Sequence, residues 1–424
     1  MALPKALIFS HYFYPDEMVS ATHMAELAEG LVKRGWEVTA MPCNRSRHDE
    51  SRTYPTRGEW NGVRIRRIWR PNLRQSSSAG RMLNAVWMVV RWSLAALSFR
   101  NAPDVIIIGT DPVLSILVAR FWKLVRRRTR VVHWCFDLYP EAAVADGVLK
   151  EGSLAHRLIL WLLPPAYRSC ELIADIGCCM RAKLAPYNPA AKQVTLTPWA
   201  LAEPEGPLPT DPEERERLFG DAPLALLYSG NFGRAHSYEE ILELARILRG
   251  RGIKLVFSVR GTREQALREA VHATDANVAF CDYASPDCLE RRLSAADIHV
   301  VSLRSGWTGT VVPSKFFGAI AAGRPVLFAG SSDSAVAKWI ESYRLGWVLT
   351  PDAVGQVADQ IAAYMKMAEE SSRMRKHCYD VYRTYFSKDR IIDSFDQELR
   401  QLAGNYLAVN RREGQKAESE RLMP

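Results

Sequence analysis

The sequence predicts an α/β protein of two doubly wound domains, each a parallel sheet with helices on both faces. Short apolar runs alternate with longer helical patterns over nearly the whole chain, which favours strands joined by helical crossovers. A proline-rich segment interrupts this alternation near the middle of the 424 residues. The composition, 48% hydrophobic and 24% charged, is that of a globular protein and excludes disordered, collagenous and coiled-coil classes.

The first half contains seven apolar runs of strand length with helical patterns between them. The predicted strands are 6–10, 37–41, 63–68, 105–108, 131–134, 172–176 and 193–196. The clearest predicted helices are 21–34, 80–98, 113–126 and 154–169. Strands that alternate with helices of this length indicate parallel pairing. Residues 1–200 therefore form the first predicted domain.

The segment from Trp199 to Pro223 breaks the pattern. It has few apolar residues and contains five prolines, at positions 204, 207, 209, 212 and 223. This composition is typical of a linker, which we place at 201–222. A long surface loop inside one domain is the alternative. The alternation resumes afterwards, and this favours a domain boundary.

The second predicted domain covers 223–385. Its predicted strands are 224–228, 255–259, 278–280, 298–303 and 326–329, and its predicted helices are 238–250, 263–272, 289–295, 314–322, 335–342 and 354–382. A last amphipathic helix follows within 386–403, and we expect Gly404 to end it before a polar tail, 404–424. Ligands of such sheets bind beyond the carboxyl ends of the strands, so two facing domains offer one cleft.

Charge is distributed unevenly along the chain. The net charge is +9, and residues 1–200 carry 27 Lys and Arg against 16 Asp and Glu. An anionic partner for the N-terminal half is one explanation, and a solvated basic surface is the other. We find no recognised nucleic-acid-binding module, and so we expect no nucleic-acid partner.

The helical segment 82–99 indicates what the anionic partner could be. It carries Val86, Trp87, Val90, Leu94 and Leu97 on one side, with Trp92 nearby and basic residues around it. This pattern suits an interfacial helix on an anionic membrane, and a core helix with a charged exposed face is the alternative. The segment is interrupted by polar residues, so we do not predict a membrane span.

The N-terminus and the cysteines bear on location. The first ten residues indicate a strand rather than a signal peptide. The eight cysteines include no C-x-x-C pair, which argues against zinc ribbons and thioredoxin-type sites. We expect reduced thiols and a cytoplasmic protein, docked peripherally on the inner face of the membrane.

Three loops carry candidate chemistry. The first, 11–20, leads from a predicted strand to a helix near Ser20, whose hydroxyl could cap it. The second, 228–234, has Gly230 and Gly233, which let the backbone approach a ligand, and Arg234, which could pair with a phosphate. A capped turn and a plain glycine turn are the structural alternatives.

The third loop, 309–325, gives the strongest local signal. Pro313 ends its extended part, Ser314 occupies a helix N-cap position, and Lys315 lies in the first helical turn. The helix dipole disfavours a cation there unless an anion is near. Structural needs explain the Gly and Pro residues of this loop, but they do not explain Lys315.

This third loop resembles the donor-site helix of family 4 glycosyltransferases with the GT-B fold, in particular the group that builds bacterial exopolysaccharide, O-antigen and colanic acid. The resemblance covers nearly the whole chain. Segments 12–38, 136–141, 229–234 and 295–303 are similar, in order, to the first strand–loop–helix, the "DLYPE" loop, the "SGN" loop and the strand before the donor helix.

The resemblance implies two Rossmann-like domains, with a saccharide or lipid-linked saccharide acceptor in the N-domain and a nucleotide-sugar donor on the C-domain. It also implies a last helix that crosses back to the N-domain, retention of anomeric configuration, and no obligatory metal or other cofactor. The chain contains no Asp-x-Asp motif. It departs from the family at Thr310 and Gly318, where two glutamates usually contact the sugar and the ribose.

The expected chemistry is electrostatic, with cations and N–H groups directed at the departing diphosphate. By the resemblance, Asp137 or Glu141 could orient the sugar, although Asp137 could also be a simple loop cap. The candidate catalytic residues are Asp137, Arg234 and Lys315, and the candidate substrate-binding residues are Ser20, Glu141, Gly230, Asn231, Gly233, Val311, Val312, Ser314 and Gly318.

Two other function classes remain at this point. A nucleotide-sugar hydrolase or epimerase on the same fold would need a carboxylate pair at the sugar, and the sequence identifies none. A non-catalytic nucleotide-sugar-binding protein is suggested by the missing glutamates. A sugar transferase fits the motifs best.

Overall fold

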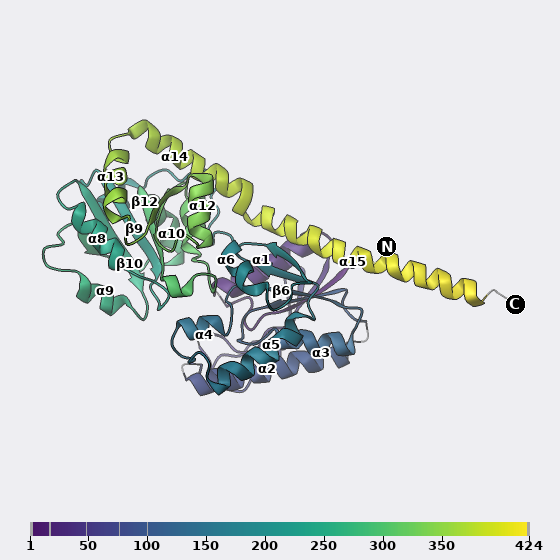
Figure 1. Ribbon diagram of the computed structural model, residues 1–424. Helices are drawn as coiled ribbons and strands as arrows, with labels where there is room; N and C mark the ends of the chain where they lie inside the picture. Colours follow the sequence, from purple (N-terminus) through teal and green to yellow (C-terminus); the bar gives the residue numbers. More distant parts are fainter. Residues whose placement is uncertain (1–2, 17, 48, 76, 100, 422–424) are drawn as a thin grey trace.

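The computed structural model describes residues 3–421 except 17, 48, 76 and 100, with the side chains of 286, 368 and 405–421 also outside the description. Two α/β lobes lie side by side, and a long C-terminal helix runs from one across the other (Figure 1). The predicted fold class is confirmed: each lobe contains one sheet, of eight and of six strands, with helices packed on it.

The N-terminal sheet has the strand order β3-β4-β2-β1-β5-β6-β7-β8. Its strands are β1 (Lys5–Phe9), β2 (Glu37–Ala40), β3 (Arg57–Trp60), β4 (Val63–Arg66), β5 (Val105–Gly109), β6 (Arg130–Trp134), β7 (Leu172–Asp175) and β8 (Lys192–Thr195). β1 pairs with β2 on one side and with β5 on the other, so the chain builds the sheet outward from β1 in one direction first and then in the other. The carboxyl end of β1 is therefore a topological switch point, where ligands of such sheets bind.

Helices cover both faces of this sheet. They are α1 (Val19–Lys33), α2 (Ser78–Ser98), α3 (Leu117–Val125), α4 (Glu141–Ala145), α5 (Leu154–Tyr167) and α6 (Cys178–Leu184). The central strand β5, with sequence VIIIG, is buried along its whole length, as expected for a parallel strand between two helical layers.

One strand of this sheet escaped the sequence analysis. β3 is short, has the sequence RGEW and is mostly exposed, so it carries no apolar pattern. It pairs antiparallel with β4 through a turn at Asn61 and Gly62, both with positive φ. Asn-Gly is the preferred pair for such hairpin turns.

The segment 201–222 is not a featureless linker, because it contains helix α7 (Pro212–Phe219). Asp211 accepts a hydrogen bond from the Glu214 N–H at 2.8 Å and so caps the helix, and Pro212 fills its first turn. The low apolar content hid this helix, because ion pairs hold it in place.

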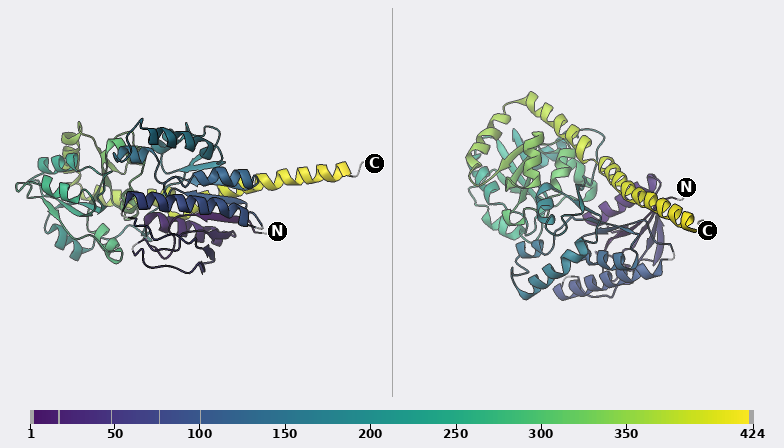
Figure 2. Two further views of the ribbon diagram at one scale, coloured as in Figure 1. Left: turned by 90° about the horizontal axis from the view of Figure 1, so that it is seen from below. Right: turned by 45° about the vertical axis from the view of Figure 1, so that its right-hand side comes forward.

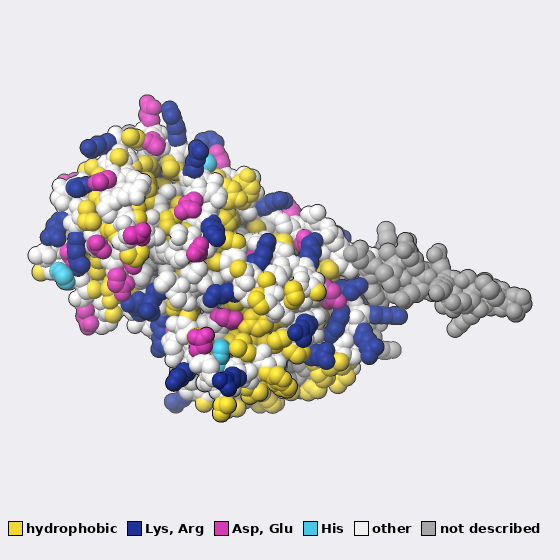
Figure 3. All heavy atoms as spheres, viewed as in Figure 1, with side chains coloured by type: hydrophobic (Ala, Val, Ile, Leu, Met, Phe, Trp, Pro, Cys, Tyr) yellow, Lys and Arg dark blue, Asp and Glu magenta, His cyan; other side chains and the backbone are white. Residues whose placement is uncertain are grey.

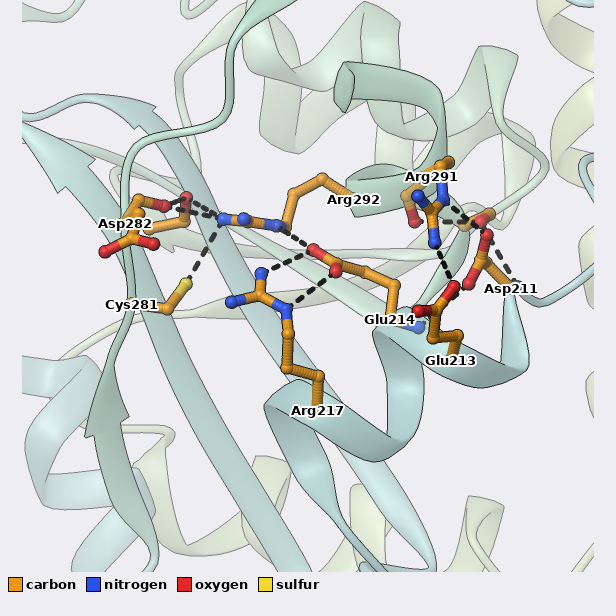
Figure 4. Close-up of polar contacts among 10 residues, drawn as sticks. Asp211, Glu213, Glu214, Arg217, Cys281, Asp282, Arg291 and Arg292 are labelled. Atoms are coloured by element: carbon orange, nitrogen blue, oxygen red, sulfur yellow. Dashed lines mark hydrogen bonds and ion pairs between the residues drawn. The ribbon is translucent and has the colours of Figure 1, made fainter. Parts of the chain in front are cut away.

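Figure 4 shows those ion pairs, which tie α7 to α10 (Leu289–Ser294). Glu214 contacts Arg217 at 2.9 Å and the buried Arg292 at 2.6 Å. Arg291 contacts Asp211 and Glu213, each at 2.8 Å. The segment is thus fixed to the C-terminal lobe.

The C-terminal sheet is entirely parallel, in the order β11-β10-β9-β12-β13-β14. Its strands are β9 (Leu224–Asn231), β10 (Ile253–Arg260), β11 (Val278–Phe280), β12 (Ile298–Leu303), β13 (Val326–Gly330) and the unpredicted β14 (Gly346–Leu349). Its switch point lies between β9 and β12. Its other helices are α8 (Glu239–Ile247), α9 (Glu264–Ala270), α11 (Lys315–Ala321), α12 (Ala335–Tyr343) and α13 (Val354–Tyr364).

The chain returns to the N-terminal lobe through α14 (Ala368–Val381), a π-helical turn (Tyr382–Phe386) and α15 (Lys388–Arg421). The single helix predicted over 354–382 is therefore wrong, since the chain turns at 365–367. In α15, Asp393 pairs with Arg34 at 2.6 Å, and Asp396 accepts a hydrogen bond from the Trp36 ring at 2.6 Å. The views in Figure 2 show α15 running along the N-terminal lobe.

The two chain crossings between the lobes touch each other. Tyr382 donates a hydrogen bond to Glu203 and accepts one from the Ala200 N–H at 3.0 Å, and Glu203 also accepts from the Lys388 N–H at 2.7 Å. The prediction that Gly404 ends the last helix is wrong. Helix α15 continues through Gly404 to Arg421. One glycine costs only about 1 kcal/mol in a helix, and the residues after it are mostly good helix formers.

Helix α2 differs from prediction in one tryptophan. Trp92 is fully buried and donates a hydrogen bond to the Met41 carbonyl at 2.7 Å, so it belongs to the core and not to the exposed side. Val86, Val90, Leu94 and Leu97 are exposed. Among the described residues, no helix combines the length and the apolar content that crossing a bilayer requires.

Candidate active site at the two switch points

The switch points of the two sheets face each other. The Leu138 N–H, in the loop after β6, donates a hydrogen bond to the Thr310 carbonyl of the other lobe at 2.8 Å. Arg234, after β9, forms an ion pair with Asp146, after α4, at 3.0 Å. These contacts bring the carboxyl edges of both sheets to one cleft.

Lys315 lies at the C-terminal switch point, in the first turn of α11. Its Nζ donates to the Asn231 carbonyl at 2.7 Å, lies 3.2 Å from His236 Nε2, and sits 5.4 Å from the centre of the Tyr228 ring. No described carboxylate lies within ion-pair distance of it. Burial lowers its pKa to about 7. An anion bound beside Lys315 would stabilise its charged form and raise this pKa again.

The neighbours of Lys315 are neutral. Burial, with the Lys315 charge next, lowers the pKa of His236 to about 3, and His236 Nδ1 lies 2.7 Å from the Ser302 carbonyl. His236 is therefore the neutral tautomer that donates from Nδ1, which leaves Nε2 to accept from Lys315.

The end of β9 and the glycine loop after it position Lys315. The strand extends to Asn231, so the first four residues of the predicted loop 228–234 belong to β9. Gly230 has φ +124°, and a Cβ there would lie 2.9 Å from Lys315 Cε, so a side chain would displace the lysine. A Cβ at Gly233 would lie 3.3 Å from the Asn231 side-chain nitrogen. Gly230 and Asn231 thus lie against Lys315, and Gly233 lies next to Asn231.

Arg234 and Lys315 contact different residues. Its side chain is 54% exposed and its guanidinium is engaged by Asp146. In this conformation it bridges the two lobes instead of pointing freely at the cleft. No local pattern pointed to this partner, which lies 88 residues away in the chain.

The start of α11 is less regular than expected. Ser314 is the N-cap residue of α11, as predicted, but it has helical φ and ψ and its exposed side chain makes no capping hydrogen bond. Its hydroxyl remains available to a ligand. Val311 and Val312 are half-buried, and Val312 packs against the cores of both lobes.

The two positions that depart from the family pattern are structurally different. Thr310 is fully buried, its hydroxyl donates to the Trp307 carbonyl at 2.8 Å, and it cannot reach a ligand. Gly318 lies half-buried in α11, where a Cβ would meet only Leu293, at 3.8 Å. Space for a side chain therefore exists at Gly318, and the chain leaves it open.

In the N-terminal lobe, Asp137 follows β6. Burial, with the nearby Asp111 charge, raises its pKa to about 6, and among the described residues none donates a hydrogen bond to its carboxylate. It lines a small pocket with Thr110 and Tyr139. This is an unsatisfied carboxyl group beside the cleft, as expected of a residue that contacts substrate.

Glu141 is positioned differently. Its Oε1 accepts a hydrogen bond from the Tyr187 hydroxyl at 2.7 Å, and its Oε2 is buried without a hydrogen-bond partner. It is tied to the body of its own lobe. Ser20 lies in the first turn of α1, which begins at Val19 after Met18, so Ser20 is not the helix cap. Its hydroxyl has no hydrogen-bond partner among the described residues.

The sequence analysis missed His11 and Asp111 as site residues. They follow β1 and β5, the two strands at the N-terminal switch point, and His11 Nδ1 lies 3.4 Å from Asp111 Oδ1. Although burial lowers the pKa of His11, the Asp111 carboxylate outweighs it and the pKa rises to about 9. A polar residue directly after each of two buried strands was the available signal.

His133 of β6 is a core residue. It is buried in β6, its Nδ1 lies 2.9 Å from the Ile108 carbonyl, and burial lowers its pKa to about 4. Among the described residues, no group of three or more His, Cys, Asp or Glu side chains is arranged to hold a metal ion.

A cavity of about 460 Å³ lies beside the N-terminal switch point. His11, Gln75, Arg81 and Asp111 line its polar part, and Trp307 reaches it from the other lobe. The cavity therefore borders both halves of the cleft.

Comparisons with known proteins agree with this architecture. Residues 20–199 match the family described as "Glycosyl transferase 4-like domain", and residues 210–381 match "Glycosyl transferases group 1". The chain is 26% identical over 308 residues to "Probable glycosyltransferase WbjE" of Pseudomonas aeruginosa, which covers 69% of this chain and 74% of that protein.

Solved structures share the fold at low sequence identity. Sucrose-phosphate synthase of Thermosynechococcus elongatus has a TM-score of 0.70 at 16% identity, over 95% of this chain and 100% of its own. HepE of Anabaena, in complex with UDP and glucose, has 0.63 at 12%, over 93% and 99%. WaaG, a glycosyltransferase involved in lipopolysaccharide biosynthesis, has 0.60 at 14%, over 93% and 99%.

Proposed function

Because the chain belongs to the GT-B glycosyltransferases, with a glycosyl transferase 4-like domain followed by a glycosyl transferases group 1 domain, we propose a specific reaction for it. It transfers a sugar, with retention of configuration and without a metal, from a nucleoside-diphosphate sugar to a growing polyprenyl-diphosphate-linked saccharide in the synthesis of a bacterial cell-surface polysaccharide. UDP-sugars are the first donors to test, since HepE was solved with UDP and glucose.

The observation that carries the donor proposal is the environment of Lys315. A cation at a switch point, held by a carbonyl and a neutral imidazole and lacking a carboxylate, matches the diphosphate of a nucleotide sugar. Gly230 lets the lysine lie against the loop, and the exposed Ser314 hydroxyl adds a donor at the same edge.

The proposed chemistry follows from this arrangement. The acceptor hydroxyl attacks the anomeric carbon from the side of the leaving group, the bond from that carbon to the β-phosphate oxygen breaks, and a phosphate oxygen takes the hydroxyl proton. Charge builds on the diphosphate, and Lys315 stabilises it. Asp137, across the cleft, orients the sugar by accepting hydrogen bonds from its hydroxyl groups.

A direct assay tests this proposal. Purified protein is incubated with a panel of nucleotide sugars and with a prenyl-diphosphate-linked saccharide, and the products are analysed by mass spectrometry and NMR. We expect one donor to yield an elongated lipid-linked product with retained configuration. Release of free nucleotide and free sugar alone would instead indicate hydrolysis, and binding without turnover would indicate a nucleotide-sugar-binding protein.

Membrane docking is the second part of the proposal. Exposed apolar side chains cover neighbouring surfaces of α2 and α5: Met82, Leu83, Val86, Val90, Leu94, Leu97, Leu154, Leu158, Trp161 and Leu162. Figure 3 shows apolar side chains along the lower edge of the N-terminal lobe, with basic side chains beside them. A groove of about 430 Å³ next to α2 is lined by Arg57, Arg66, Arg67 and Arg91 and by no acidic residue.

These features suit an anionic membrane surface, where each well-placed arginine contributes about 1 kcal/mol. We expect binding to vesicles that contain phosphatidylglycerol, weaker binding in high salt, and none to phosphatidylcholine alone. Val86→Asp with Val90→Asp should release the protein without changing nucleotide affinity. Ile247→Asp, an exposed apolar position on the other lobe, is the matched control. Equal binding to neutral and anionic vesicles would contradict the proposal.

A further inference from the structure

The cavity beside the N-terminal switch point has hydrogen-bond donors that nothing uses. His11 is 3% exposed and Gln75 is 7% exposed. Among the described residues, His11 Nε2, Gln75 Nε2 and Trp307 Nε1 are buried and have no hydrogen-bond partner, and all three residues line this one cavity. Buried polar groups in native proteins are normally paired, so three unpaired donors among the residues that line one cavity indicate an acceptor that is not part of the chain.

The charges of the cavity select the kind of acceptor. Arg81 also lines it, and no described carboxylate lies within ion-pair distance of Arg81. Its two acids are already engaged, since Asp111 pairs with His11 and Asp146 with Arg234. Because Asp111 keeps His11 protonated, His11 Nε2 is a donor. Three donors and an unpaired guanidinium suit anionic oxygens.

A buried cation close to Tyr12 adds to this preference. Arg70 is fully buried, and its three guanidinium nitrogens have no hydrogen-bond partner in the part of the chain that the structure describes. Its charge acts on Tyr12, whose ring stacks on His11 with the ring centres 4.3 Å apart. Arg70 therefore adds a positive charge to the His11 side of the cavity, beside the His11–Asp111 pair.

The rest of the cavity is apolar. Met82 and Ala85 of α2, Val113, Leu149 and Ile159 of α5 line it. Met82 is exposed and lies one helical turn from Val86, so the apolar lining continues into the exposed apolar side of α2. A ligand that fits both parts has a phosphate at one end and a hydrocarbon chain at the other.

We propose that this cavity binds the phosphate end of a prenyl-phosphate-linked acceptor, with its oxygens on His11, Gln75, Trp307 and Arg81 and its first hydrocarbon units against Met82 and Ile159. The assignment rests on the proposed lipid-linked acceptor and names the residues that hold it. The chain of the lipid then leaves the cavity along α2 toward the membrane.

The test uses the full chain and farnesyl diphosphate as the probe, with UDP present in excess to occupy the donor site. Calorimetry should detect farnesyl diphosphate binding, and farnesol or inorganic diphosphate should bind at least tenfold more weakly. Arg81→Gln and Gln75→Leu should each weaken binding roughly tenfold. Arg74→Gln is the matched control, because Arg74 is a neighbouring exposed arginine that does not line the cavity.

Other outcomes would overturn the assignment. Equal affinity for farnesol would mean an apolar site only, and equal affinity for inorganic diphosphate would mean a free-phosphate site. Competition by phosphatidylglycerol vesicles with unchanged affinity in Arg81→Gln would place the probe on the membrane surface. UDP binding with no farnesyl diphosphate binding would remove this inference and leave the donor proposal standing, whereas loss of both would remove the donor proposal as well.

Discussion

The two switch points occupy equivalent places in their sheets, but they differ in the charged groups that surround them. At the C-terminal one, Lys315 is surrounded by a carbonyl, a neutral imidazole and an aromatic ring. At the N-terminal one, the cation His11 already has the carboxylate Asp111, and Asp137 lies nearby. The first site is unfinished without an anion, and the second offers both donors and acceptors. One lobe is thus suited to a diphosphate and the other to a ligand with hydroxyl groups as well as a phosphate.

The largest expected effect is at Lys315. Lys315→Ala should remove about 2–4 kcal/mol of transition-state stabilisation, roughly 30- to 1000-fold in kcat/KM, because the diphosphate loses its charge-assisted contact. Steady-state kinetics with the active donor measure this. Lys338→Ala, an exposed lysine on α12 of the same lobe, is the control. Activity at the wild-type level in Lys315→Ala would contradict the assignment of the diphosphate to the C-terminal switch point.

Asp137 tests the other side. A carboxyl group whose folded-state pKa is about 6, above the ordinary value of 3.8, stabilises the fold only while it is protonated. That stability is lost as pH rises through 6. Asp137→Asn should therefore raise the free energy of unfolding by about 3 kcal/mol at pH 8 and by about half that at pH 5, while it slows transfer. Urea unfolding at the two pH values measures the difference, and an equal gain at both would contradict the cause given.

The pKa of Lys315 gives a third test. Bound diphosphate raises that pKa from about 7, so the affinity for a UDP-sugar, whose diphosphate does not titrate near pH 7, should be constant just below pH 7 and fall up to about tenfold per pH unit above it. His236 stays neutral and Tyr228 stays protonated over this range, so Lys315 is the group that titrates. Calorimetry at pH 8 should also detect proton uptake. Lys315→Arg, which stays charged, should remove the pH dependence.

The smallest effect is expected at Arg234. Its pair with Asp146 is exposed, and such pairs contribute about 0.2–1 kcal/mol. Arg234→Ala should therefore raise the donor KM by only about two- to fivefold. A double-mutant cycle with Asp146→Ala separates two roles. If the arginine only bridges the lobes, the double variant should match the single ones. If it also contacts the diphosphate, Asp146→Ala alone should leave donor affinity intact.

The sequence predicted the features that depend on local pattern. Buried parallel strands such as β5, with its VIIIG run, carry their own signal, and so does a lysine in the first turn of α11. Features stabilised by distant partners were missed. β3 depends on its hairpin partner, α7 on Arg291 and Arg292, and the burial of Trp92 on the Met41 carbonyl.

The site divides in the same way. The glycine loop and Lys315 were found because glycine and a misplaced charge are visible in one segment. His11 with Asp111 was missed, and Arg234 and Glu141 received roles without their partners, because each partner lies 46 to 100 residues away. Whether a charged side chain is free for a ligand or already paired within the protein becomes clear only when the fold brings its partner next to it.

The contact between the two chain crossings has a mechanical consequence. Because Tyr382 and Glu203 fasten one crossing to the other, the two covalent connections between the lobes run together along a single line. Rotation about that line remains soft, while sliding or twisting of one lobe against the other would break these hydrogen bonds. We therefore expect the cleft to widen most at the edge far from this hinge, so that substrates enter and products leave by one swinging motion.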